Sequence, residues 1–213
     1  MSTWNNVVHM NELKITENGI YYFDDYIPVW KWKWEKYKDN LGVSKLILDY
    51  KEGLKIATAV FTSDFEDALI YLSNKILYKN VTEIALVAVP PSEVDKYSPI
   101  RNSINKIVEK FDNGEISDFK YVNKIHNCSN LLLRIRDVES NKYNKRKRVF
   151  FDHYSSIDFD EDLVEDLEDV VFIIMDDITT EGFTMHVCEE ILMDYGISED
   201  NIYKLVIAET VDD

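Results

Sequence analysis

The chain has 213 residues and a mass of 25.0 kDa, which suits one domain with a small attachment and excludes two full catalytic domains. It is 46% hydrophobic with only 6 Gly and 4 Pro, so it can bury a core and is neither fibrous nor broadly disordered. Its 40 acidic and 24 basic residues give a net charge of −16, which disfavours general binding to nucleic acid or anionic membranes.

Cysteine usage and hydropathy predict a soluble cytoplasmic protein. Cys128 and Cys188 lie far apart and have no partner at metal-ligand spacing, so we expect two reduced thiols. The chain has no run of about 18 apolar residues that could span a bilayer. The N-terminus also lacks the basic-then-apolar layout of a signal peptide.

The N-terminal part of the chain is predicted to be rich in β-structure. Asn18-Gly19 separates two β-prone runs within 13–23, which is typical of a hairpin. Residues 29–34 then alternate Trp and Lys with period two, which predicts a half-buried strand with three indoles on one face. An aromatic surface for nucleic-acid bases is the functional alternative for this segment.

Further along, predicted strands alternate with predicted helices. Helices are expected at 64–77, from 98 to about 111, and at 183–195 with Gly196 at the end; strands are expected at 83–89, 131–135, 148–151, 170–175 and 202–208. The acidic stretch 158–169 is interpreted as a solvated linker. The alternation predicts an α/β fold with a mainly parallel sheet flanked by helices in residues 45–213, preceded by a small β-rich hood in residues 1–44.

The most informative stretch runs from residue 170 to 184. A buried strand ends in Asp176 and Asp177, a loop of threonine and glycine follows, and a helix then begins. Such a loop offers backbone N–H groups and a helix dipole to a phosphate, while carboxylates accept hydrogen bonds from sugar hydroxyls. The stretch therefore favours a sugar-phosphate site. A bare divalent cation site or a response-regulator-like acidic pocket is the alternative for the two acids.

This stretch resembles the signature of the type I phosphoribosyltransferases, in which a hydrophobic strand and two acids precede a Thr-rich, Gly-containing loop. The resemblance implies that Asp176 and Asp177 contact the ribose hydroxyls of phosphoribosyl pyrophosphate (PRPP). It implies a 5-phosphate site formed by Thr179, Thr180, Gly182, Phe183 and Thr184. Glu181 departs from the pattern, because the family usually has an uncharged or basic residue there.

Three weaker stretches, at 87–92, 131–136 and 148–151, are similar to the ComF-like, competence-associated branch of that family. The likeness implies a pyrophosphate site formed by Pro91, Ser92, Arg101, Arg134 and Arg148. The chain lacks the N-terminal Cys-x-x-Cys pairs that are common in the branch.

A basic segment supports an anionic substrate independently of the resemblance. Residues 131–150 contain seven basic and two acidic side chains, a local charge of +5, so the other residues sum to −21. In a protein that is acidic overall, a ligand rich in phosphate needs a locally basic segment of this kind. The alternative is a solvated hairpin whose lysines pair with the acidic stretch 158–169.

The expected function follows from the resemblance. It implies that the protein binds Mg²⁺-PRPP and transfers the 5-phosphoribosyl group to a nitrogen nucleophile, a nucleobase or an amine, with release of pyrophosphate. Mg²⁺ is expected to arrive with the substrate rather than in a protein metal site. A catalytically inactive PRPP- or nucleotide-sensing module is the alternative, and Glu181 favours it. Single-strand nucleic-acid binding is a third, weaker hypothesis, and a homodimer is left open.

Overall fold

The computed structural model describes residues 13–77, 81–138, 150–164, 167 and 169–211. Its strands are β1 (Lys14–Ile15), β2 (Ile20–Tyr26), β3 (Glu83–Ala88), β4 (Lys124–Cys128), β5 (Leu132–Arg134), β6 (Ile157–Phe159), β7 (Val171–Thr179) and β8 (Ile202–Thr210). Its α-helices are α1 (Gly42–Lys51), α2 (Lys55–Tyr71), α3 (Pro99–Asp112), α4 (Phe150–Tyr154) and α5 (Phe183–Asp194). Short 3₁₀ turns cover Val29–Lys31, Glu35–Asn40, Glu161–Leu163 and Glu199–Asn201, and a π-helical turn, Leu72–Ile76, extends α2.

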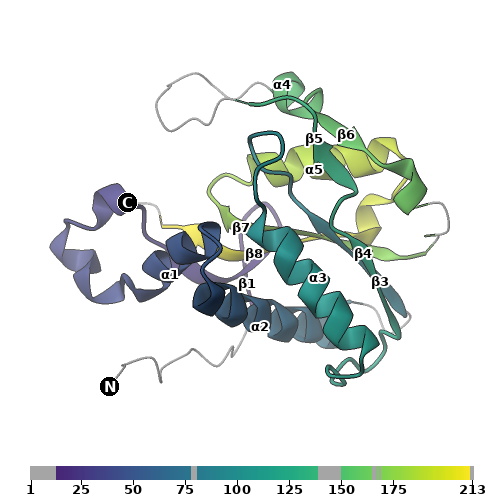
Figure 1. The fold of residues 1–213 in the computed structure, drawn as a ribbon, viewed down its shortest axis with the longest axis horizontal. Coiled ribbons are helices and arrows are strands. Elements are labelled where there is room, and N and C mark those ends of the chain that lie inside the picture. Colours follow the sequence, from purple (N-terminus) through teal and green to yellow (C-terminus); the bar gives the residue numbers. More distant parts are fainter. Residues whose placement is uncertain (1–12, 78–80, 139–149, 165–166, 168, 212–213) are drawn as a thin grey trace.

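The centre of the fold is a six-stranded sheet with the order β1-β2-β8-β7-β3-β4 (Figure 1). All its strands are parallel except β1, which pairs antiparallel with β2. Strands β5 and β6 form a separate antiparallel pair. The predicted α/β class with a mainly parallel sheet is therefore confirmed. The likeness to the fold of one particular family stays a prediction.

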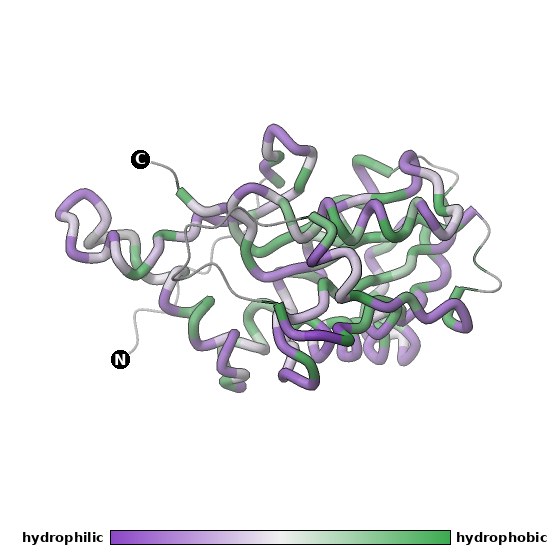
Figure 2. Tube along the Cα trace, turned by 90° about the horizontal axis from the view of Figure 1, so that it is seen from above, coloured by the Kyte–Doolittle hydropathy of each residue, from purple (hydrophilic) through white to green (hydrophobic). Residues whose placement is uncertain are grey.

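Helices cover both faces of the sheet. Helices α1, α2 and α3 pack on one face, and α5 packs on the other face together with β5 and β6 (Figure 1). Figure 2 shows hydrophobic residues mainly in the interior of the trace and hydrophilic residues on many outer loops. Strand β3, predicted at 83–89, is apolar and buried from Ile84 to Ala88 because both of its faces are covered.

Local signals explain several element boundaries. Gly19, with φ +72°, makes the turn between β1 and β2, which confirms the hairpin. The Oγ of Ser98 accepts a hydrogen bond from the backbone N–H of Arg101, and Pro99 is the first residue of α3, so the predicted start of this helix is confirmed. Gly196, with φ +90°, follows the C-cap of α5, as expected.

The predicted strand at 29–34 is wrong, because this segment forms 3₁₀ turns with hydrogen bonds from Lys31 N to Pro28 O and from Trp32 N to Val29 O. The indoles do not share a buried face: Trp30 is 57% exposed, whereas Lys31 is buried and donates through Nζ to Val211 O. The neighbouring strand β8 ends at Thr210, so the segment has no strand to pair with and bonds locally instead.

Two helices differ from the prediction. Helix α2 begins at Lys55 rather than near residue 64, because Ala57, Phe61 and Phe65 already continue its buried stripe toward the sheet. Residues 63–66 have the Ser-x-x-Glu pattern of a capping box, which predicts a helix start there, but they lie inside α2. Helix α1 and strand β4 were not predicted from the sequence at all.

The predictions between residues 131 and 169 are partly wrong. The strand at 131–135 exists as β5, but it pairs with β6 and not with the main sheet. Phe150 and Phe151, predicted as strand, begin helix α4, and 148–149 lie outside the described residues. The acidic stretch 158–169 contains the last two residues of β6 and a 3₁₀ turn rather than only linker.

The N-terminal hairpin extends the main sheet, because β2 pairs in parallel with β8 over the length of β2. It does not form a sheet of its own, and the division at residue 44 stays a prediction. Cys128 and Cys188 are buried free thiols, as expected. Within the described parts of the chain, no helix has the length and apolar character needed to cross a bilayer.

Candidate functional site

The sheet has a topological switch point between β3 and β7. These two strands are parallel neighbours, and the chain leaves them in opposite directions: α3 crosses one face to reach β4, and α5 crosses the other face to reach β8. In open α/β sheets, ligands bind outside the carboxyl ends of the strands at such a point. This edge of the sheet is therefore the candidate site.

Asp176 and Asp177 lie at the switch point. The last register pair between β3 and β7 joins Ala88 to Met175, and Val89 N donates to Met175 O at 3.0 Å. The two acids follow directly, where β7 continues beside β8 alone. Both side chains are half-buried. The neighbouring strand β3 thus ends where the two acids begin, at the carboxyl edge of the sheet.

The two carboxylates occupy different surroundings, because successive residues of a strand point to opposite faces of the sheet. Asp177 pairs with Lys51, the last residue of α1, with 2.8 Å between Oδ1 and Nζ. Asp176 accepts a hydrogen bond on Oδ1 from the Asp177 backbone N–H at 2.8 Å. The pKa of the buried Cys188 thiol on α5 is raised, mainly by burial and also by the Asp176 charge.

Lys51 is held as a cation at this site. Burial alone would lower the pKa of its ammonium group, but the contact with Asp177, together with Asp176 and Tyr26, raises that pKa above its ordinary value. Burial also raises the pKa of the Tyr26 phenol, and the nearby Lys51 charge opposes this effect. The site therefore contains two carboxylates, an ammonium and a neutral phenol.

The loop after the acids is ordered by the N-terminal hairpin. Asn18 Nδ2 donates to the backbone carbonyl of Glu181 at 3.2 Å. Gly182 is buried with φ +71°, and a Cβ added there would lie 2.7 Å from Ile20 Cδ1. Glycine is required at this position both by the backbone conformation and by the close approach of Ile20.

Helix α5 starts directly after this loop. Gly182 is its N-cap, and its carbonyl accepts the hydrogen bond from His186 N at 2.9 Å. The first backbone N–H groups of a helix have no acceptor within the helix, so the start of α5 is suited to an anion. Phe183 and Thr184 are half-buried there, and the side chain of Glu181 is exposed.

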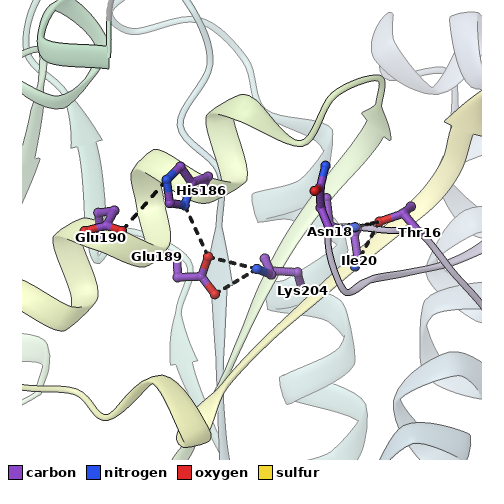
Figure 3. A network of polar contacts seen from close by, with 7 residues as sticks. All are labelled: Thr16, Asn18, Ile20, His186, Glu189, Glu190 and Lys204. Carbon is purple, nitrogen blue, oxygen red and sulfur yellow. Dashed lines mark hydrogen bonds and ion pairs between the residues drawn. The ribbon is translucent and has the colours of Figure 1, made fainter.

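Contacts on both sides fix the loop and the helix (Figure 3). The Oγ1 of Thr16 accepts hydrogen bonds from the backbone N–H groups of Asn18 and Ile20, which braces the hairpin turn. Lys204 of β8 donates to both carboxylate oxygens of Glu189, at 2.7 and 2.8 Å, and so ties α5 to the sheet. Thr180 and Thr210 share a hydroxyl hydrogen bond of 3.0 Å, and Thr179 is buried at the end of β7.

The residues expected to bind pyrophosphate are only partly brought to the switch point. Pro91 and Ser92 follow β3, as expected for a loop at this edge. The guanidinium groups of Arg101 and Arg134 instead donate to backbone carbonyls, and burial lowers the pKa of both. Arg148 lies outside the described residues.

Sequence reasoning missed Lys51 and Tyr26. A lysine at the end of a helix and a tyrosine at the end of a strand are ordinary in those positions, so neither carries a local signal of function. Only the packing of α1 beside β2 and α2 brings Lys51 to the acids.

A cavity of about 420 Å³ is lined by none of the predicted ligand residues. It is lined by Asp24, Asp25, Ile27, Lys36, Tyr37, Gly42, Val43 and Val211. Since none of the predicted ligand residues lines it, we place the candidate site at the switch point, where the acids, the glycine loop and the helix start converge.

No protein-family model matches the chain, and no curated protein matches it at a significant level.

Proposed function

We propose that this protein binds Mg²⁺-PRPP at the switch point and transfers its 5-phosphoribosyl group to a nitrogen nucleophile, a nucleobase or an amine, releasing pyrophosphate. The observation that carries the proposal is the convergence of Asp176 and Asp177, the Gly182 loop and the start of α5 at the carboxyl ends of parallel strands. Carboxylates suit the ribose hydroxyls, and the loop and the helix start suit the 5-phosphate.

Catalysis of this kind depends on positioning and charge rather than on a covalent intermediate. Bond breaking leaves positive charge on the ribose, which the neighbouring carboxylates stabilise, while the departing pyrophosphate needs cationic groups. The Asn18 contact and the Lys204 ion pair hold the loop and α5 in place, so the 5-phosphate would anchor a substrate at a fixed distance from the acids.

The residues at the site are compatible with Mg²⁺ that arrives with the substrate. Mg²⁺ prefers oxygen ligands, which Asp176 and Asp177 offer, but Asp177 already pairs with Lys51. Among the described residues, no group of three or more His, Cys, Asp or Glu side chains is placed to hold a metal ion. When bound with the diphosphate, the metal would neutralise part of its charge.

A second candidate is an inactive module that senses PRPP or a nucleotide. Glu181 favours it, because a carboxylate exposed on a phosphate loop repels the ligand and lowers its affinity. In this case binding would persist without transfer.

Isothermal titration with Mg²⁺-PRPP tests the proposal. We expect the wild-type protein to bind and Asp177→Asn to lower the affinity at least tenfold, since a hydrogen bond to a charged group contributes about 1.5–3 kcal/mol. Asp112→Asn, an exposed change at the end of α3, is the matched control and should bind normally. Pyrophosphate release is then measured with purines, pyrimidines and amines. Binding without release supports the sensor, and absence of binding refutes both candidates.

A further inference from the structure

Lys51 places a partly exposed cation beside Asp177 at the candidate site. Its ammonium group lies 2.8 Å from Asp177 Oδ1, yet its side chain remains 41% exposed, whereas that of Asp177 is only 15% exposed. An ammonium group has three N–H donors, and the ion pair with Asp177 needs one of them. The exposed side of Lys51 can therefore donate to a ligand while the ion pair stays in place.

The arginines expected at the pyrophosphate are occupied with the protein backbone. Arg101 donates through Nε to Ser129 O and through Nη2 to Leu132 O, each at 3.1 Å. Arg134 is 7% exposed and donates to Pro91 O at 2.8 Å and also to Ser156 Oγ. These bonds shape the loops around the site and direct both guanidinium groups toward carbonyl and hydroxyl oxygens of the protein.

The turn that follows α1 lies close to the loop that follows β3. The chain turns at Gly53, with φ +73°, and a Cβ added there would lie 2.9 Å from the ring of Tyr97. Tyr97 belongs to the β3–α3 loop, immediately before the Ser98 cap. The turn two residues after Lys51 therefore lies against the loop expected to face the diphosphate, while Lys51 itself pairs with Asp177.

We propose that Lys51 contacts the diphosphate group of the bound ligand and fills the role that the sequence suggested for Arg101 and Arg134. This inference rests on the proposed function. Asp177 would keep its ion pair with the Lys51 ammonium through one oxygen and accept a hydrogen bond from a ribose hydroxyl on the other. The ion pair would then join the residues that bind the ribose to the residue that binds the diphosphate. A cation here also compensates the two acids, which would otherwise repel an anionic ligand.

Binding of two ligands separates this role from a structural one. Mg²⁺-PRPP carries the diphosphate, whereas ribose 5-phosphate shares the sugar and the 5-phosphate but lacks it. We expect Lys51→Met to lower the affinity for Mg²⁺-PRPP at least tenfold and to change the affinity for ribose 5-phosphate less than twofold. Lys55→Met, an exposed change at the start of α2, should alter neither affinity. Lys51→Gln keeps a donor for Asp177 and replaces Lys51→Met if the latter does not fold.

Each result has a clear meaning. If the wild type binds both ligands but the Lys51 variants weaken both equally, Lys51 only positions Asp177 and our inference is wrong, while the proposed function stands. If the variants weaken neither ligand, the inference is also wrong. If the wild type binds neither ligand, the proposed function fails and this inference falls with it.

Discussion

Gly182→Ala tests whether the N-terminal hairpin determines the conformation of the loop that precedes α5. Gly182 has φ +71°, a conformation that residues with a Cβ rarely adopt. The added Cβ would also lie 2.7 Å from Ile20 Cδ1, and Ile20 is only 2% exposed, so its side chain has little space into which it can move.

The expected cost has two parts. A left-handed backbone costs a residue with a Cβ about 1–2 kcal/mol. Relieving the overlap with a packed core side chain costs about 1–3 kcal/mol more. We therefore expect Gly182→Ala to lower the free energy of unfolding by roughly 2–5 kcal/mol, which corresponds to a fall of about 4–20 °C in Tm for a protein of this size.

Equilibrium unfolding in urea measures this loss, and two variants separate its parts. Gly114→Ala shares a φ of +72° but has no atom within 4 Å of the added Cβ, so it should lose only the backbone part. Ile20→Val removes Cδ1, so in the Ile20→Val background the further loss caused by Gly182→Ala should equal that of Gly114→Ala. Equal losses for Gly182→Ala and Gly114→Ala, without coupling to Ile20, would refute the role assigned to the hairpin.

Two further predictions concern stability. Arg134→Met should lower the free energy of unfolding by about 2–4 kcal/mol, because it leaves the loop carbonyls and the Ser156 hydroxyl without their donor; a shift in the urea midpoint worth less than about 1 kcal/mol would contradict this. Burial, with Asp67 and Asp24 adding to it, raises the pKa of Asp64 from 3.8 to about 7. The folded protein then binds this proton more tightly than the unfolded chain, so the group lowers stability progressively as the pH rises from about 4 to about 7. Asp64→Asn should therefore stabilise the protein by about 1–2 kcal/mol at pH 8, allowing for solvent screening, and by almost nothing at pH 4; an equal effect at both values would exclude this explanation.

The sequence alone predicted those parts of the molecule that depend on local chemistry. The Asn18-Gly19 turn, the Ser98 cap and Gly196 each act within a few residues, so their effect on the backbone can be predicted from the local sequence. The apolar runs of β3 and β7 likewise show that both faces of these strands are covered. The same signals placed Asp176 and Asp177 at the edge of the sheet.

Only the tertiary structure decided what those residues face. The Trp–Lys alternation at 29–34 would fit a strand, but no neighbouring strand is available to pair with it. Arg101 and Arg134 look like ligands for pyrophosphate, but backbone carbonyls distant in the sequence accept their hydrogen bonds. Lys51 shows the reverse case: it carries no local signal, and the packing of α1 against the sheet places its charge beside Asp177. Side-chain partners depend on contacts between distant segments, and those contacts exist only in the folded chain.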